Sequence, residues 1–339
     1  MASGDFTRNL TDVSKKAAPS ASIPPRCSAV GLIPEIARAA RLGRIQGHRL
    51  CSTGTEHSIY RLKTVKGEFA VRIESARTAD RGWMRHRRLV KLGVAPRLFR
   101  EGRIRVGGRQ SHYAVFEWMT GRPLDYGRDL CRLARTLAQL HRQTRGLRIA
   151  PRSEASLGRY LMKRVVQGDR VVAIRGVIGE SLSRLRTEGL AALSNHPSAN
   201  MDFQCLVHND LVRGNIVVAS DRAMLIDWDW AMNASPVVDL CGFLSPFVTS
   251  WDREMMLGEQ AIATFLRAYF KGHDRADVGE IYRSLSDCWA LCGAVVANWD
   301  YLNSSKSRPH LKEPAFYRRA CARTLAIGHF LKVSARPIL

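Results

Sequence analysis

The sequence has 339 residues, of which 45% are hydrophobic and 24% charged. This is ordinary globular composition, and the chain is long enough to bury a large core. We expect neither a signal peptide nor a membrane span, because the N-terminus lacks an apolar leader and no run of 18 apolar residues occurs. The eight cysteines form no CxxC pair, which is typical of a cytoplasmic protein and excludes a disulfide-stapled scaffold.

The net charge of +23 is unevenly distributed along the chain. Residues 201–339 contain 15 basic and 15 acidic residues, so the whole positive excess lies in the first 200 residues. That excess is spread out, rich in arginine and without interleaved aromatic residues. We interpret it as a solvated basic surface and expect no specific nucleic-acid partner.

The N-terminal part of the chain predicts a small sheet with helices. Residues 1–27 have no periodicity and predict a disordered tail. In the N-terminal lobe, 28–119, hydrophobic periodicity and turn residues predict a series of elements. They are a helix at 32–45, strands at 46–52, 57–64 and 68–74, a helix at 78–92 and two strands within 97–119.

The C-terminal part, 120–339, predicts a mainly helical lobe. The clearest helix is 128–143, in which leucines recur on one face at helical spacing. Further helices are predicted within 155–195 and at 251–271, 277–302 and 314–332. Sheet first and helices afterwards predict the α+β fold class.

One stretch, residues 205–230, carries the chemistry. A short apolar run leads into the polar loop HNDLVRGN, and two further apolar runs around an Asp-Arg turn predict a β-hairpin. This hairpin brings Asp210, Asn215 and Asp227 to one edge. Oxygen ligands of this kind suit Mg²⁺ held together with substrate phosphates.

The spacing within this stretch is specific. His-x-Asp-x-x-x-x-Asn, followed about a dozen residues later by a strand-borne Asp, is the layout of a kinase catalytic loop and its metal-binding Asp. Phosphoryl transfer needs a carboxylate to orient the attacking hydroxyl and accept its proton. It also needs an amide and a second carboxylate to hold the metal.

At HNDLVRGN and LIDWDWA the chain resembles the aminoglycoside phosphotransferase and choline kinase superfamily. The wording is most similar to the choline and thiamine kinase-like branch. The resemblance implies a two-lobed, protein-kinase-like fold, ATP and Mg²⁺ as cofactors, and a small-molecule hydroxyl as acceptor. By position it implies that Asp210 is the catalytic base, that Asn215 and Asp227 bind metal, and that Asp239 is structural.

The same resemblance assigns nucleotide contacts to the N-terminal lobe, 28–119. Arg72, in the strand sequence AVRI, occupies the place of the phosphate-binding lysine. Gly54 and Thr55 lie in the turn expected over the phosphates, and Glu117 and Met119 lie in the hinge expected to meet adenine.

One feature departs from the family's pattern. In the family, the helix after the cation-bearing strand supplies an acid that pairs with that cation. Here the helix at 78–92 offers only Asp80. The departure leaves the partner of Arg72 open and keeps an inactive kinase-like binding module, using the basic half to engage nucleic acid or membrane, as an alternative.

Possible acceptor contacts are Asp229, Trp228, Trp230 and Trp289. Aromatic residues at helical spacing ordinarily pack in cores, but aromatic faces also attract quaternary ammonium groups. We therefore expect an amino alcohol such as choline, or a thiamine-like cation, as the acceptor. An aminoglycoside is the alternative, although the charge-balanced C-terminal half offers a polycation little acidic excess.

Overall fold

The structure is a computed structural model. It describes residues 30–53, 57–75, 83–106, 109–150, 157, 160–161, 163–165, 176–195, 204–220, 222–250, 256–303 and 313–333. The predicted tail at 1–27, the loop residues Gly54 and Thr55, and Asp80 lie outside these ranges. The chain forms two compact units: unit 1 comprises Met1–Asp80 and Leu98–Trp118, and unit 2 comprises Arg81–Arg97 and Met119–Leu339.

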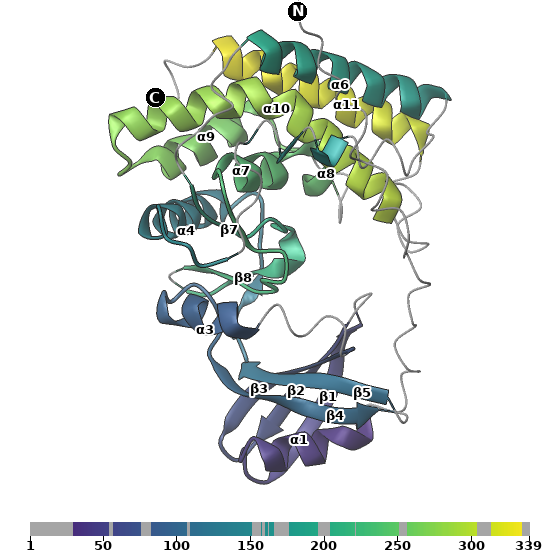
Figure 1. Ribbon diagram of the computed structural model, residues 1–339, viewed down its shortest axis with the longest axis vertical. Coiled ribbons are helices and arrows are strands. Elements are labelled where there is room, and N and C mark those ends of the chain that lie inside the picture. The colour runs from purple at the N-terminus through teal and green to yellow at the C-terminus, as the bar shows by residue number, and fades with distance from the viewer. Residues whose placement is uncertain are drawn as a thin grey trace, which may run out of the picture. The chain divides into compact units, whose positions relative to one another are not determined.

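Unit 1 contains a five-stranded antiparallel sheet in the order β1-β2-β3-β5-β4 (Figure 1). The strands are β1 Ile45–Thr53, β2 His57–Thr64, β3 Gly67–Ser75, β4 Leu98–Val106 and β5 Arg109–Glu117. All five predicted strands are therefore present. A turn before Gly67 joins β2 to β3, and Gly67 has a φ of 131°, which favours glycine.

Helix α1, Ile33–Ala39, follows a short 3-10 turn at Val30–Leu32 and packs against one face of this sheet. The sequence predicted a longer helix, 32–45. It ends early because Arg41 and Gly43 adopt positive φ values of 55° and 80°, a left-handed conformation that terminates helices.

The two faces of β3 have different characters. Phe69, Val71 and Ile73 are buried in a core shared with α1. Because successive side chains of a strand point to opposite faces, the intervening Arg72 and Glu74 lie on the other face. Both are also buried, with 6% and 5% of their surfaces exposed. Unit 1 therefore has an apolar face and a face that buries charge.

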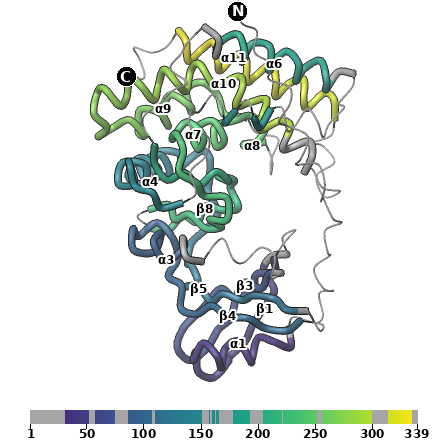
Figure 2. Tube along the Cα trace, in the orientation of Figure 1, coloured from purple at the N-terminus to yellow at the C-terminus, as the bar shows by residue number. Residues whose placement is uncertain are grey.

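Unit 2 is mainly helical, as predicted. Its helices are α3 Trp83–Lys91, α4 Leu130–Gln143, α6 Gly176–Asn195, α7 Val237–Leu244, α8 Pro246–Thr249, α9 Glu259–Phe270, α10 Arg275–Asn303 and α11 Pro314–Val333. α9 begins at Glu259 because Gly258 before it is extended. Of the helix predicted at 251–271, residues 251–255 lie outside the described residues. α10 lies alongside α6 and α11 (Figures 1 and 2).

Short strands bring the catalytic stretch together. β8 Ile216–Val218 and β9 Ala223–Leu225 form the predicted hairpin, and β6 Arg122–Pro123 pairs with β8. β7 Cys205–Val207 pairs instead with β10 Met232–Ala234. A 3-10 turn at Arg213–Asn215 leads into β8. The loop between β7 and β8 is thus held by strands at both ends.

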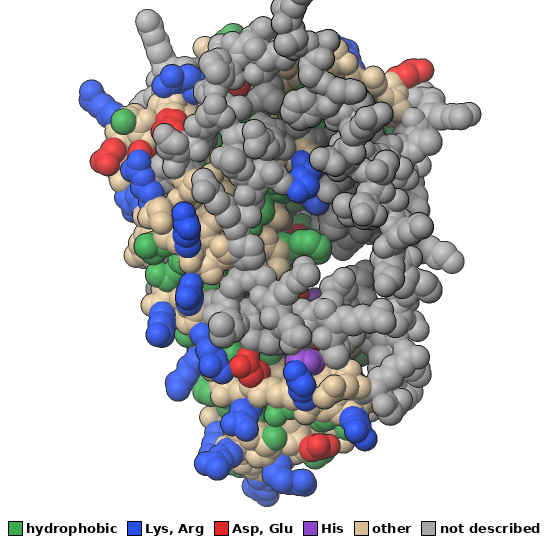
Figure 3. All heavy atoms as spheres, in the orientation of Figure 1, with side chains coloured by type: hydrophobic (Ala, Val, Ile, Leu, Met, Phe, Trp, Pro, Cys, Tyr) green, Lys and Arg blue, Asp and Glu red, His purple; other side chains and the backbone are tan. Residues whose placement is uncertain are grey.

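Exposed cations gather on unit 1. On the face of unit 1 that Figure 3 shows, Lys and Arg side chains are more frequent than acidic ones. Exposed examples near the turn between α1 and β1 are Arg38, Arg41, Arg44, Lys63 and Lys66. This agrees with the basic surface expected from the sequence. In the described part of the chain, no helix is both long and apolar enough to cross a bilayer.

Candidate active site

The buried strand β7 delivers His208 to the start of the polar loop. His208 is fully buried, and its Nε2 lies 2.9 Å from the carbonyl oxygen of Ile226, to which it donates. Its ring packs against Trp228 with 4.6 Å between centroids. His208 therefore ties the loop to the chain that leaves β9, immediately before Asp227.

Asp239, near the start of α7, anchors the backbone of this loop. Its Oδ2 accepts from His208 N at 2.9 Å, and its Oδ1 accepts from Asn209 N at 2.7 Å. On the other side, His141 Nε2 of α4 lies 3.1 Å from Asp239 Oδ2, and His141 Nδ1 lies 2.9 Å from the Tyr269 hydroxyl. One buried carboxylate thus fixes two successive peptide groups of the loop.

Two residues of the stretch have left-handed backbone conformations. Asn209 has a φ of 62° and Asp227 a φ of 63°. Asn and Asp tolerate this region better than other non-glycine residues, because their short polar side chains form local hydrogen bonds. Such conformations cost of order 1–3 kcal/mol each and cluster at active sites. Asn209 immediately precedes Asp210 in the loop. Asp227 carries the carboxylate that is predicted to bind metal.

Asp210 and Asn215 are in direct contact. Asn215 Nδ2 donates to the backbone oxygen of Asp210 and to its carboxylate Oδ2, both at 2.9 Å. The amide nitrogen is thereby occupied, and among the described residues Asn215 Oδ1 accepts no hydrogen bond. This leaves an amide oxygen available as a ligand, the kind of donor that Mg²⁺ takes.

Asn215 and Asp227 offer an amide oxygen and a carboxylate, which are donor types that Mg²⁺ takes when it is shared with substrate phosphates. Among the described residues, no group of three or more His, Cys, Asp and Glu side chains could hold a metal ion. Mg²⁺ is usually bound by one or two carboxylates together with substrate phosphates. Asn215 and Asp227 therefore fit Mg²⁺ that arrives with a nucleotide.

The pKa of Asp210 is raised above its ordinary value, chiefly by burial. The charges of Asp227 and Asp229 raise it further, whereas His208 and the hydrogen bond from Asn215 lower it. A raised pKa makes the carboxylate a better proton acceptor, as general-base catalysis requires.

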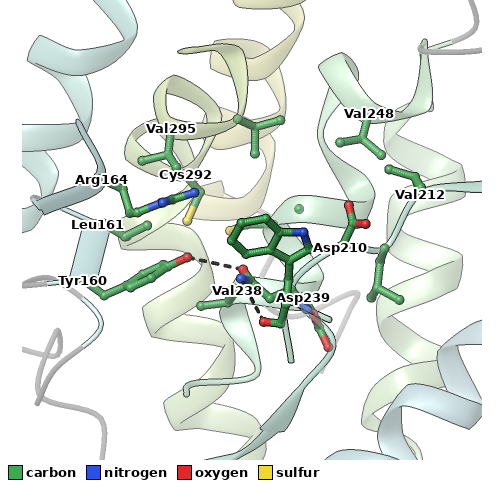
Figure 4. A pocket seen from close by; sticks show the side chains of 16 residues that line it. Tyr160, Leu161, Arg164, Asp210, Val212, Val238, Asp239, Val248, Cys292 and Val295 are labelled. Atoms are coloured by element: carbon green, nitrogen blue, oxygen red, sulfur yellow. Dashed lines mark hydrogen bonds between the residues drawn. The ribbon is translucent and has the colours of Figure 1, made fainter. Parts of the chain in front are cut away.

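A pocket opens beside Asp210, entirely within unit 2. Figure 4 shows Tyr160 and Arg164 on one side of it and Asp210 with Val212 on the other. Much of the described wall is aliphatic, including Leu161, Leu211, Val238, Val248, Val295 and Val296. Such a wall with a few polar groups is typical of small-molecule sites.

Asn209 and Trp230 form part of the pocket wall. The Tyr160 hydroxyl donates to Asn209 Oδ1, and Asn209 Nδ2 donates to the backbone oxygen of Trp230, both at 3.3 Å. Trp230 is 50% exposed. Of the predicted acceptor contacts, Trp230 is the one that lines this pocket. Asp229 is exposed beside it.

Trp228 and Trp289, which the sequence predicts as possible acceptor contacts, are buried, and neither lines this pocket. Trp228 is 6% exposed and donates its indole N–H to Leu225 O at 2.9 Å. Trp289 is 2% exposed and donates to Thr324 O at 2.9 Å. Their large apolar area and satisfied N–H groups favour burial.

The predicted nucleotide contacts lie at the following places. Arg72 is on β3, where it pairs with Glu74. Glu117 ends β5 with an exposed side chain, and Met119 follows Trp118 as a half-buried residue outside any strand. Their roles toward a nucleotide stay predictions.

A family model describing a phosphotransferase enzyme family matches residues 48–278, which is more than half of the chain. The chain belongs to this phosphotransferase family. The match includes the strands of unit 1, the polar loop and α7. No curated protein sequence matches the phosphotransferase.

Solved structures share the fold of this phosphotransferase at low sequence identity. An aminoglycoside phosphotransferase from Alicyclobacillus acidocaldarius is 19% identical, with a TM-score of 0.57 over 88% of this chain and 95% of its own. A choline/ethanolamine kinase family protein from Mesorhizobium loti is also 19% identical, with a TM-score of 0.57 over 90% and 97%. The α+β, kinase-like fold implied by the resemblance is thereby confirmed.

A third structure of the same fold contains ligands. It is a thermostable mutant of an aminoglycoside phosphotransferase in a ternary complex with AMP-PNP and hygromycin B. It is 12% identical to this phosphotransferase, with a TM-score of 0.60 over 88% of this chain and 99% of its own. The family and the fold are shown, whereas acceptors named for these relatives differ from one another.

Sequence reasoning missed three contacts at the site. The sequence does not predict the bond between His141 and Asp239. The amide of Asn209 joins Tyr160 to Trp230. Glu74 was not considered as the partner of Arg72, although the alternation of β3 places both on one face. Only the last of these contacts had a signal in the sequence.

Proposed function

We propose that this phosphotransferase transfers the γ-phosphoryl group of ATP to a hydroxyl group of a small molecule bound in the pocket beside Asp210. Asp210 orients the acceptor hydroxyl and accepts its proton. Asn215 and Asp227 hold Mg²⁺, and Arg72 holds a phosphate group of the nucleotide. Such catalysis consists mainly of positioning and electrostatic stabilisation.

The contact between Asn215 and Asp210 carries this proposal. The two bonds from Asn215 Nδ2 hold the Asp210 carboxylate at the pocket wall. They also leave the amide oxygen of Asn215 available as a ligand. A carboxylate for the proton and an amide for the metal, joined in this way, meet the requirement of phosphoryl transfer. When bound, Mg²⁺ neutralises charge on the phosphates.

Support for ATP as the donor comes from the family and from the relative solved with AMP-PNP. In this chain, Arg72 provides a permanently charged group that can bind phosphate through two nitrogens. Gly54 and Thr55, with the segment from Glu117 to Met119, complete the proposed nucleotide contacts.

For the acceptor we favour a compact amino alcohol or a thiamine-like cation over an aminoglycoside. Trp230 offers a half-exposed indole face, to which a single quaternary ammonium group is attracted. A polycationic antibiotic needs several carboxylates. Of the acidic residues in the described wall, Asp210 serves catalysis and Asp239 is engaged with the loop.

Arg164 supports a second candidate, an acceptor that is neutral or carries an anionic group. It contributes a positive charge to the described wall, close enough to the Tyr160 hydroxyl to lower the pKa of that group against the dominant effect of burial. A positive charge in a pocket of low polarity repels cations. Acceptors of both charge types therefore belong in one assay.

The test is transfer of label from γ-labelled ATP with Mg²⁺ to choline, ethanolamine, thiamine, several aminoglycosides, a neutral diol and a hydroxy acid. We expect label on one class, and we expect Asp210→Asn to lower kcat by about 10²–10⁴-fold, the usual contribution of general-base catalysis. Asp227→Ala is expected to abolish metal-dependent turnover while the protein remains folded.

Two controls make the result decisive. Glu188→Gln removes an exposed carboxylate on α6 that does not line the pocket and is expected to retain turnover within a few-fold. Circular dichroism on every variant separates loss of chemistry from loss of fold. Undiminished turnover in Asp210→Asn, or undiminished labelling of the acceptor without Mg²⁺, contradicts the assigned roles.

A further inference from the structure

The buried ion pair on β3 gives Arg72 an acidic partner within its own strand. Arg72 Nε lies 3.1 Å from Glu74 Oε2, and one of its terminal nitrogens, Nη2, lies 2.9 Å from the same oxygen. The side chains are 7% and 3% exposed. The partner of the strand cation thus lies two residues further along the same strand.

We propose that Glu74 is the positioning residue for Arg72: it orients the guanidinium for nucleotide phosphate, a role that an acid on the following helix would otherwise have. This inference rests on the proposed function. It assigns Glu74 no contact with the reacting atoms.

Strand geometry explains why Glu74 can do this. Residues i and i+2 of a strand point to the same face, so the two side chains lie next to each other without any help from tertiary packing. Across the sheet, Arg72 is opposite Ile59 on β2 and Ala114 on β5. Neither of these two side chains can accept a hydrogen bond from the guanidinium, whereas Glu74 can.

Stability alone is a poor explanation for the pair. Burying two charges carries a desolvation penalty that often exceeds their attraction, and well-packed apolar residues of similar volume are frequently as stable. The apolar face of β3, with Phe69, Val71 and Ile73, already supplies the core of unit 1. A buried Arg and Glu on the opposite face therefore indicate a functional constraint.

The experiment measures nucleotide binding directly, by calorimetric titration of ADP in the presence of Mg²⁺, together with steady-state constants for ATP and acceptor. Glu74→Gln keeps the shape of the side chain and removes its charge. We expect ADP affinity to fall by about tenfold, which is a difference of about 1.4 kcal/mol, and the KM for ATP to rise while the acceptor KM stays within twofold.

Asp80→Asn is the matched control, since it removes the single acid in the predicted helix at 78–92. It is expected to leave ADP affinity unchanged. Arg72→Ala combined with Glu74→Gln is expected to bind ADP no more weakly than Arg72→Ala alone, because a positioning residue has no effect once its target is gone. Additive losses contradict the proposal.

Other results also decide the matter. Unchanged or tighter ADP binding in Glu74→Gln overturns the proposal, tighter binding meaning that Glu74 competes with phosphate for Arg72. A loss in Asp80→Asn alone assigns the role to the helix. If Glu74→Gln does not fold, Glu74→Asp retains the charge at a shorter reach and should bind ADP with intermediate affinity; wild-type affinity there overturns the proposal. Absence of ADP binding and turnover in the wild type refutes the proposed function itself.

Discussion

The two units of this phosphotransferase hold their buried carboxylates in opposite ways. In unit 2, Asp239 receives two backbone N–H groups from a loop about thirty residues earlier in the chain and contacts His141 of α4. In unit 1, Glu74 is paired with Arg72, two residues away in the same strand. Asp239 therefore fixes the path of the chain, whereas Glu74 fixes one side chain.

This difference determines what each carboxylate contributes. A carboxylate that binds backbone groups from distant elements is part of the fold, so its loss deforms the catalytic loop. A carboxylate that pairs with its neighbour on a finished sheet can be lost while the sheet remains. When a carboxylate is removed, we therefore expect the loss of unfolding free energy to depend on how many elements it joins and how deeply it is buried. The presence of an ion pair is expected to matter less.

The largest effect is expected for Asp239→Ala. The substitution leaves the N–H groups of His208 and Asn209 and the ring of His141 without their buried acceptor, which costs about 3–5 kcal/mol of unfolding free energy. Urea unfolding measures the loss. Asp229→Ala, at an exposed carboxylate, is the control and should change stability by less than about 1 kcal/mol. Similar values for the two variants would mean that the contacts of Asp239 with the loop do not stabilise the protein more than an exposed carboxylate does.

An intermediate effect is expected for Asp129→Asn. Asp129, before α4, accepts from Arg122 Nη1 at 2.5 Å, from Arg122 Nη2 at 2.9 Å and from Asp125 N at 2.9 Å. It joins the β6 segment to α4, but the Arg122 side chain is 40% exposed, so water screens the pair. We expect a loss of about 1 kcal/mol at neutral pH.

The same pair predicts a pH dependence. The hydrogen bond from Arg122 lowers the pKa of Asp129 below its ordinary 3.8, although burial opposes this. A carboxyl group with a lowered pKa in the folded state stabilises the protein above the unfolded-state pKa and loses that contribution as the pH falls through the folded-state value. The stability difference between wild type and Asp129→Asn should thus be constant above about pH 5 and shrink below pH 4. A difference that grows on acidification contradicts this assignment.

The smallest effect is expected for Glu188→Ala on α6. Glu188 pairs with Arg184 at 3.1 Å, with 47% and 73% of the two side chains exposed. An exposed pair at i and i+4 stabilises a helix by about 0.3–0.5 kcal/mol. Thermal unfolding at low and high salt should show a difference that disappears as salt rises. A loss of unfolding free energy above about 1 kcal/mol would mean that an exposed ion pair stabilises the protein more than its low burial predicts.

Much of the fold was predictable, because local patterns determine it. Alternation in β2 and β3, the β8–β9 hairpin and the leucine face of α4 are all local patterns. The limits of α1 and α9 were less predictable, since they depend on the backbone at Arg41 and Gly43 and at Gly258.

The contact between Asp210 and Asn215 was predictable from the sequence, and the contacts that support the loop were less so. The spacing of Asp210 and Asn215 predicts that they meet, and they do. The bond between His141 and Asp239 joins residues 98 positions apart, and no periodicity indicates such a pair. Trp228 and Trp289 are a further case, because the sequence alone does not tell whether an indole ring faces a ligand or the core.

Asn209 has a consequence for how this enzyme could change over evolutionary time. Its backbone needs a left-handed conformation, which glycine adopts at least as readily, while its amide links Tyr160 to Trp230. Replacement by glycine would keep the path of the catalytic loop and release both aromatic residues. A single mutation at this position could therefore widen the range of acceptors while the machinery of phosphoryl transfer stays intact.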